Sequence, residues 1–196
     1  MALTLVKEDG TGLATANSYA SVADGDSYFE GHLYASAWTA ATSVTKAAAL
    51  VMATRLVDTQ FQFHGFRTNE TQALQWPRER CADPDRNLVT SSSLSPVLTN
   101  FVPSNLVPKP VAAAVCEMAR ELLLADRTAA PPGEGVSSTQ TSQATHDATG
   151  GSSSMTSISY SKEDTRPIMS RVAQAMLAKY GALIQGGSGS VRLVRV

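Results

Sequence analysis

The stretch of sequence that decides the fold runs from Asn17 to Arg78. It reads NSYASVADGDSYFEGHLYASAWTAA (17–41), KAAALVMATRLVD (46–58), FHGFRT (63–68) and QALQWPR (72–78). Apolar residues recur at helical spacing in the first two pieces, and a turn that carries Trp38 separates them. The last two pieces hold a backbone corner at Gly65 and the extended dipeptide Trp76-Pro77. This order predicts a compact helical scaffold with anchored connections and no catalytic constellation.

Four helices are expected along the whole chain. The first spans about 22–33, with Ser21 and Asp24 in a capping-box arrangement and with Gly25 suggesting close packing. The second spans about 44–59, and Trp38 is expected to pack as a core residue over its seam with the first. The third spans about 110–126, starts at Pro110 and should be the most buried. The fourth spans about 166–183, with an apolar stripe of Ile168, Val172, Met176 and Tyr180.

The connections between these helices are expected to be long. Residues 2–6 (ALTLV) suit a short edge strand, and residues 60–109 form a connection rich in turn residues. Residues 131–157 contain twelve Ser or Thr, which predicts a mobile loop or linker. Residues 154–161 (SMTSISYS) regain strand character and suggest a loose hairpin or extended arm. The fold class predicted is therefore mainly α, a bundle of about four helices with long loops, a small β hairpin or extended arm, and a flexible C-terminal tail.

The domain prediction places a helical connector domain at 1–185, with the Ser/Thr-rich loop 128–157 inserted, and a docking arm at 186–196. The arm consists of GGSGS (186–190) followed by VRLVRV, which is apolar, basic and free of proline. Such a composition suits a strand that pairs with another chain, whereas the alternative is a frayed chain end. We favour docking, and the residues expected to make it are Val191, Arg192, Leu193, Val194, Arg195 and Val196.

Charge is distributed unevenly over the 196 residues, whose formal net charge is −1. Residues 1–164 carry 11 Lys or Arg and 17 Asp or Glu, a balance of −6. Residues 165–196 carry five basic residues and no acidic one, a balance of +5. The acidic body argues against a nucleic-acid binder that relies on bulk positive charge. The basic end suggests docking on an acidic partner, or alternatively only a basic helix end with two solvated arginines.

No arrangement of reactive side chains predicts an enzyme. His32, His64 and His146 are scattered, and together with Cys81 and Cys116 they show no metal-ligand spacing. The acidic residues Asp24, Asp26 and Glu30 are expected on a solvated helix face, and DPD at 83–85 resembles a cation-binding turn only weakly. We therefore expect no catalytic residue, no cofactor and no metal. The start of the chain lacks a signal peptide and no apolar run is long enough for a membrane span, which suggests synthesis in a cytoplasm and no membrane partner.

Three blocks of the sequence carry a resemblance to a known family. They are ANSYASVADGDSYF (16–29) with Trp38; KAAALVMATRLVD, FHGFRT and ALQWPR; and VPKPVAAAVCEMARELL (107–123), followed by SISYS (157–161) and the last helix. In this order they resemble the head-tail connector (adaptor) proteins of tailed bacteriophages. Part of that group carries the label DnaT-like single-stranded-DNA-binding.

The resemblance implies a structural protein of the virion. Such a protein forms a ring, commonly of twelve copies, at the head-tail junction, where it joins the portal protein to tail or neck proteins. The ring extends the channel, and packaged double-stranded DNA passes through it without sequence-specific contact. Manufacture in the host cytoplasm and localisation in the virion follow from the same resemblance.

Two rival functions stay open beside the connector. One is a single-stranded-DNA-binding replication accessory protein, and the other is a non-structural phage helper. Aromatic residues make up 6% of the chain, and basic residues do not cluster before residue 165. Because single-strand binders combine a basic groove with stacking aromatics, the composition predicts weak binding of single-stranded DNA.

Overall fold

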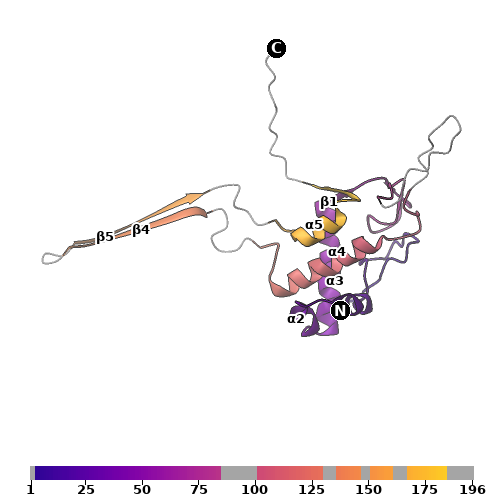
Figure 1. Ribbon diagram of the computed structural model, residues 1–196, viewed down its shortest axis with the longest axis horizontal. Helices are drawn as coiled ribbons and strands as arrows, with labels where there is room; N and C mark the ends of the chain where they lie inside the picture. Colours follow the sequence, from indigo (N-terminus) through magenta and orange to yellow (C-terminus); the bar gives the residue numbers. More distant parts are fainter. Residues whose placement is uncertain (1–2, 85–100, 130–135, 147–150, 161–166, 185–196) are drawn as a thin grey trace, which may run out of the picture. The chain divides into compact units, whose positions relative to one another are not determined.

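The computed structural model of the chain describes residues 3–84, 101–129, 136–146, 151–160 and 167–184 (Figure 1). Contacts between residues divide the chain into two units. One consists of residues 1–126 with 169–196, and the other consists of residues 127–168.

The start of the first helix follows the sequence signal. In α1 (Val22–Phe29), the Ser21 hydroxyl accepts the backbone N–H of Asp24 at 3.1 Å, and the Asp24 carboxylate accepts the backbone N–H of Ser21 at 2.7 Å. The capping box is confirmed, but the helix ends at Phe29, earlier than expected. The short helix α2 (Ser36–Thr39) then carries Trp38, which is fully buried. Its indole N–H donates to Asp26 at 2.9 Å, so the expected core position of Trp38 is confirmed.

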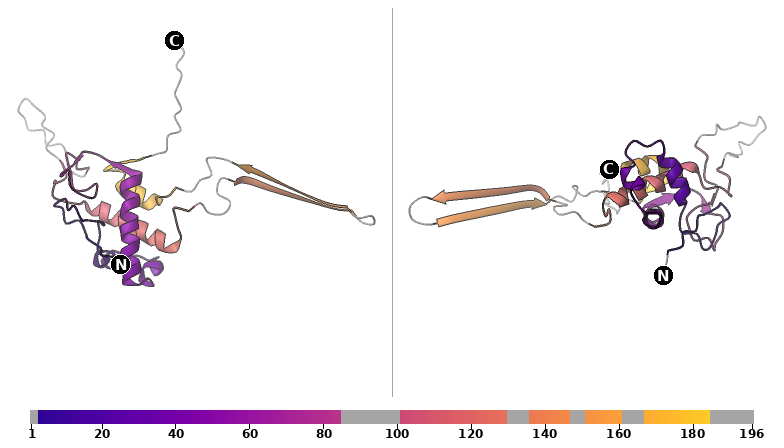
Figure 2. Two further views of the ribbon diagram at one scale, coloured as in Figure 1. Left: turned by 180° about the vertical axis from the view of Figure 1, so that it is seen from behind. Right: turned by 90° about the horizontal axis from the view of Figure 1, so that it is seen from below.

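Two longer helices form the centre of this unit. Helix α3 (Ser43–Gln60) is capped by Thr42, and helix α4 (Lys109–Leu124) has its proline in the first turn. The two helices contact each other, and α4 also contacts α5 (Arg171–Leu177), as Figures 1 and 2 show. The expectation that α4 is the most buried helix is confirmed by its fully buried residues, which are Val111, Ala114, Val115, Met118 and Ala119.

The last predicted helix is only half right. Helix α5 ends at Leu177, and residues Gly181–Leu183 form strand β6, which pairs antiparallel with β1 (Phe61–Phe63). A side chain at position 181 would lie 2.8 Å from the Cα of Phe63, so only glycine permits this approach. The alternation of buried Phe61, exposed Gln62 and buried Phe63 places both rings in the core.

The expected connection 60–109 also contains strands. After β1, strand β2 (Phe66–Arg67) pairs antiparallel with β3 (Arg78–Glu79), with Phe66 opposite Glu79 and Arg67 opposite Arg78. An isolated bridge joins Ala82 to Phe101 beyond this pair. In the N-terminal segment, the edge strand expected at 2–6 is absent from the described residues 3–6, and an isolated bridge between Lys7 and Ser18 stands nearby.

The second unit is built on a long β hairpin rather than a loop. Strand β4 (Val136–His146) pairs antiparallel with β5 (Gly151–Tyr160), in a register that sets Thr139 opposite Ile158 and Thr141 opposite Thr156 (Figure 2). The guanidinium of Arg127 donates to the carbonyls of Pro167 at 2.9 Å and Ile168 at 3.3 Å, which ties the two ends of this unit together. The mobile loop predicted at 131–157 was wrong over β4 and the start of β5, whereas the strand character predicted at 154–161 is confirmed by β5. The threonines of this run are β-branched and therefore favour a strand.

The fold class is therefore mixed α and β, and the prediction of a mainly α bundle was wrong. In the described part of the chain, five helices accompany three two-stranded antiparallel sheets. The predicted boundary at 185/186 and the tail 186–196 lie outside the described residues, so the two-part division into domain and arm stays a prediction.

Candidate nucleic-acid interface and apolar pocket

One buried arginine fixes the corner between β1 and β2. Arg78 is 7% exposed, and its guanidinium donates to the carbonyls of His64 at 2.8 Å and Gly65 at 2.6 Å. It also donates to the carbonyl and side-chain oxygens of Gln75, at 3.1 and 2.9 Å. Since its donors are directed at the protein's own backbone, Arg78 holds this corner in shape and is not free for a ligand.

A second buried network fastens the loop before Arg78 to helix α3. The Tyr19 hydroxyl donates to Asp58 at 2.7 Å and accepts the backbone N–H of Trp76 at 3.0 Å. The other carboxylate oxygen of Asp58 accepts the backbone N–H of Gln75 at 3.0 Å. Burial raises the pKa of Asp58 to about 6, although these hydrogen bonds and the charge of Arg78 act to lower it.

Two aromatic rings are exposed on segments that pair with β3 or with the residues just after it. Phe66 is 68% exposed on β2, and Phe101 is 37% exposed at the bridge to Ala82. Arg67 follows Phe66 on β2, and Arg80 comes directly after β3. Both arginines are exposed. We call these four residues (Phe66, Arg67, Arg80 and Phe101) the β2–β3 patch.

The backbone around this patch is tight. Arg80 has a φ of 55°, a left-handed conformation that L-residues rarely adopt. A Cβ at Gly65, whose φ is 75°, would lie 2.8 Å from the backbone nitrogen of Cys81. The only other charged group in the paired residues of β2 and β3, besides Arg67 and Arg78, is the exposed Glu79. Phe66 shares its face of the pair with Glu79, whereas Arg67 shares the other face with Arg78, because successive side chains of a strand alternate.

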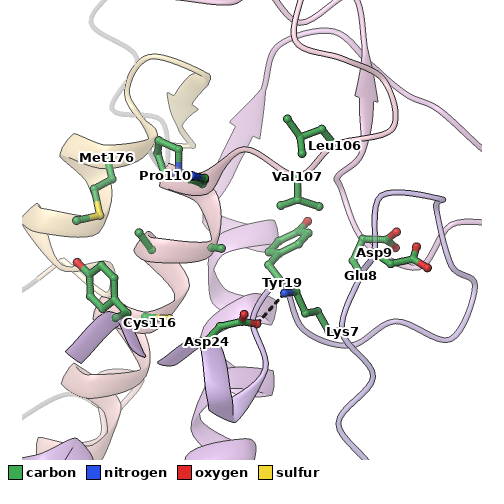
Figure 3. A pocket seen from close by; sticks show the side chains of 14 residues that line it. Lys7, Glu8, Asp9, Tyr19, Asp24, Leu106, Val107, Pro110, Cys116 and Met176 are labelled. Atoms are coloured by element: carbon green, nitrogen blue, oxygen red, sulfur yellow. Dashed lines mark ion pairs between the residues drawn. The ribbon is translucent and has the colours of Figure 1, made fainter. Parts of the chain in front are cut away.

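An apolar pocket lies elsewhere in the same unit. It has a volume of about 1000 Å³ and opens between α1, the start of α4, residues 106–107 and α5 (Figure 3). Its surface is mainly apolar, and Val107, Pro110, Ala112, Ala113, Cys116 and Met176 contribute to it. Burial raises the pKa of Cys116 to about 12, so this thiol stays protonated and unreactive near neutral pH.

Charged residues stand along one side of the pocket. Lys7 pairs with Asp24 at 2.8 Å, which Figure 3 marks with a dashed line. The buried carboxylate of Glu8 accepts three backbone N–H groups, those of Gly10, Gly12 and Leu13, at 2.9 to 3.0 Å. Glu8 therefore shapes the 8–13 turn.

Asp9 and Lys109 complete the charged set of this pocket. Asp9 is exposed, and hydrogen bonds from Thr11 lower its pKa. The pocket lining thus carries three carboxylates and two ammonium groups.

The histidines and cysteines are placed apart, as the sequence suggested. His32 lies 3.3 Å from the buried carboxylate of Glu117, which also accepts the Tyr28 hydroxyl at 3.0 Å and Arg120 at 3.2 Å. Cys81 and Cys116 are both buried free thiols. Within the described residues, no group of His, Cys, Asp and Glu could hold a metal ion, and no helix is long and apolar enough to cross a membrane.

A protein-family model matches residues 3–196, nearly the full chain. Its description is "Putative DnaT-like ssDNA binding protein". The chain belongs to this family. No curated protein and no solved structure matches it.

Membership of the DnaT-like family corrects the main functional prediction. The family is described by binding to single-stranded DNA, so the ring at a head-tail junction was wrong as the first choice. The predicted partners were wrong for the same reason: the portal, tail and neck proteins, the twelve-copy ring, and packaged double-stranded DNA. The alternative, a single-stranded-DNA-binding protein, agrees with the family.

The residues predicted for docking, Val191 to Val196, lie outside the described part of the chain. The β2–β3 patch was missed, because FHGFRT was interpreted only as an anchored corner. The sequence signal was the pair of phenylalanines on either side of Gly65, since a sharp corner there can direct Phe63 inward and Phe66 outward. Nothing in the sequence around Phe101 indicates that its ring is exposed.

Proposed function

We propose that this protein binds single-stranded DNA and that the β2–β3 patch contacts it. The observation that carries the proposal is the match of residues 3–196 to the DnaT-like single-stranded-DNA-binding family. The patch supports it, since base stacking on aromatic side chains and backbone contact by cations are what sequence-tolerant binding of single strands requires.

The geometry of the patch suits an unpaired strand. Phe66 exposes about two thirds of its surface, and the pairing of β2 with β3 holds its backbone in place. Arg67 has one weak hydrogen bond, from its guanidinium to the carbonyl of Gln72 at 3.4 Å, so its remaining donors can reach a phosphate. A base would stack on Phe66, while Arg67 or Arg80 pairs with a phosphate farther along the strand, where the DNA passes the edge of the β2–β3 pair.

Charge sets the strength of this binding. The balance of −6 over residues 1–164 opposes phosphate groups, and only two exposed arginines belong to the patch. Stacking must therefore supply much of the affinity. This agrees with the weak binding that the composition predicts.

Substitutions in the patch test the proposal directly. Binding of a fluorescent oligothymidylate is measured by anisotropy at low salt for the wild type, for Phe66→Ala and for the double variant Arg67→Gln/Arg80→Gln. Loss of one stacked base should weaken binding about tenfold, since such a base contributes roughly 1–3 kcal/mol.

Two exposed residues away from the patch serve as matched controls. Tyr34 is 76% exposed after α1, and Arg55 is exposed on α3. Tyr34→Ala and Arg55→Gln should leave the affinity within about twofold, because single surface substitutions remove no stacked base. If the controls weaken binding as much as the patch variants do, the strand binds elsewhere. If the wild type shows no binding at low salt, the function itself is refuted.

A further inference from the structure

The pocket beside α1 and α4 has no role in the DNA contact described above. It is large and apolar, and it lies in the same unit as the residues 169–196. Leu106 at its edge is 48% exposed, and Ala112, Ala113 and Met176 present partly exposed apolar surface to it. Pockets of this size bury most of a ligand's surface, so an apolar occupant is expected.

The charges along the pocket favour a cationic occupant over an anionic one. Three carboxylates and two ammonium groups line it, and Lys7 is already paired with Asp24. Asp9 is exposed, and of the described contacts it makes only local ones with Thr11. A phosphate or a DNA strand would meet these carboxylates, whereas a guanidinium could pair with Asp9 or replace Lys7 at Asp24.

We propose that this pocket binds residues 191–196 of the same chain. The segment VRLVRV supplies four apolar side chains and two arginines in six residues, which is the chemistry that the pocket requires. Val191, Leu193, Val194 and Val196 fill the apolar surface, and Arg192 and Arg195 pair with Asp9 and Asp24.

The chain is long enough to reach its own pocket. Met176 lines the pocket and Ile184 follows it by eight residues, so the two lie at most about 28 Å apart. The twelve residues 185–196 can span about 40 Å when extended. Attachment through a short connecting segment gives an effective concentration in the millimolar range, so even modest complementarity favours binding within one chain.

Photo-crosslinking of the full chain tests this assignment. A benzophenone amino acid replaces Leu193, the sample is irradiated, and the adducts are mapped by mass spectrometry. Adducts in the monomer at Met176, Leu106 or the Ala112 and Ala113 pair are expected. The variant Ala113→Trp, which fills the pocket, should lose them while retaining the thermal unfolding profile of the parent.

Each other outcome counts against the proposal. Adducts spread over the surface, unchanged by Ala113→Trp, would overturn it. Adducts found only in crosslinked dimers would assign the pocket to a second copy and would likewise overturn binding within the chain.

Trypsin provides an independent measurement on the unmodified chain, because it cleaves after Arg192 and Arg195. Cleavage there should be about tenfold slower in the wild type than in Ala113→Trp, since bound residues are protected. Equal rates would mean that the segment does not bind the pocket. Neither experiment involves DNA, so its result is independent of the proposed single-strand binding.

Discussion

Gly25 shows how one missing side chain lets two helices approach. A Cβ at this position would clash with Cζ2 of the buried Trp38 ring and lie 2.8 Å from its Cη2. The close packing expected from a glycine inside α1 is thus confirmed, and its partner is the indole. Trp38 cannot easily move away, because its N–H is bonded to Asp26 and Lys46 lies 5.2 Å from its ring centroid.

The variant Gly25→Ala should therefore destabilise the protein. Alanine favours a helix over glycine by about 1 kcal/mol, but overpacking against a fixed ring costs about 1–3 kcal/mol. We expect a net loss of up to about 2 kcal/mol in urea unfolding. The control is Gly31→Ala, because a Cβ at Gly31 would meet nothing within 4 Å. A gain in stability for Gly25→Ala would contradict the packing described for Trp38.

Asp58 should make stability depend on pH in an uncommon direction. Its pKa of about 6 in the folded protein lies above the ordinary 3.8, so between these values the folded state binds a proton that the unfolded state releases. Stability from this group is present at low pH and is lost as pH rises from about 4 to 6, by roughly 3 kcal/mol in total. The variant Asp58→Asn, which stays neutral, should remove this loss.

Urea unfolding at several pH values measures the effect as the difference between wild type and variant. As pH rises from about 4 to 6, the wild type should lose stability relative to Asp58→Asn. Asp26 provides a control of opposite sign, because the hydrogen bonds from Lys46 and Trp38 lower its pKa. The free energy of unfolding of the wild type should rise relative to that of Asp26→Asn as pH rises through the ordinary carboxyl range. A flat difference for Asp58→Asn would mean that the buried carboxylate is already ionised at pH 4.

At the scale of the elements, the sequence predicts the bounds of a helix well where the apolar periodicity and the capping residue indicate the same start. Helix α3 was expected at about 44–59 and spans Ser43–Gln60. The last helix was only half right, because two possible apolar stripes compete in a short segment. The expected stripe included Val172, which is 48% exposed, while the buried residues are Met169, Ala173, Leu177 and Tyr180. Only packing against α4 and pairing with β1, both distant in sequence, choose between them.

The hairpin was predicted only in part, because strand character was expected at 154–161 but a mobile loop was expected where β4 lies. Its described strands contain no Asp, Glu, Lys or Arg, and the apolar residues are too few to mark one buried face. Backbone hydrogen bonds therefore hold the two strands together, and such bonds cannot be predicted from amino-acid composition. An isolated two-stranded hairpin is only marginally stable in water, so its own contribution to folding is small.

Replacing residues 136–160 by a short Gly-Ser linker should therefore leave the first unit folded. Val136 and Tyr160 are partners across the ladder, so their backbones lie close together and a few residues can join them. The core cluster contains no described residue of either strand. We expect the free energy of unfolding, followed by tryptophan fluorescence, to change by less than about 0.5 kcal/mol, as for surface changes. A loss of several kcal/mol would show that the hairpin stabilises the core.

At the scale of the whole molecule, charge argued against the function that the family match favours. Net charge and the absence of a basic cluster before residue 165 argued against strong binding of DNA. For that reason single-stranded-DNA binding was only the alternative prediction. Exposure of Phe66 depends on the corner that Arg78 closes with the carbonyls of residues 63–65. That arrangement joins residues distant in sequence, so a pattern along the chain does not reveal it.

The salt dependence of DNA binding separates the patch from the basic end of the chain. For single strands, the slope of log K against log salt is about −0.7 for each phosphate neutralised. Two arginines, Arg67 and Arg80, predict a slope of about −1.4, and Arg67→Gln/Arg80→Gln should bring it close to zero. If all five basic residues beyond 165 also contacted DNA, the slope would reach about −5. Anisotropy titrations with oligothymidylate between about 50 and 300 mM salt measure it. A slope of about −3.5 that the double substitution leaves unchanged would move the contact from the β2–β3 patch to the five basic residues beyond 165. A shallow slope that the double substitution abolishes would leave the aromatic patch as the binding surface.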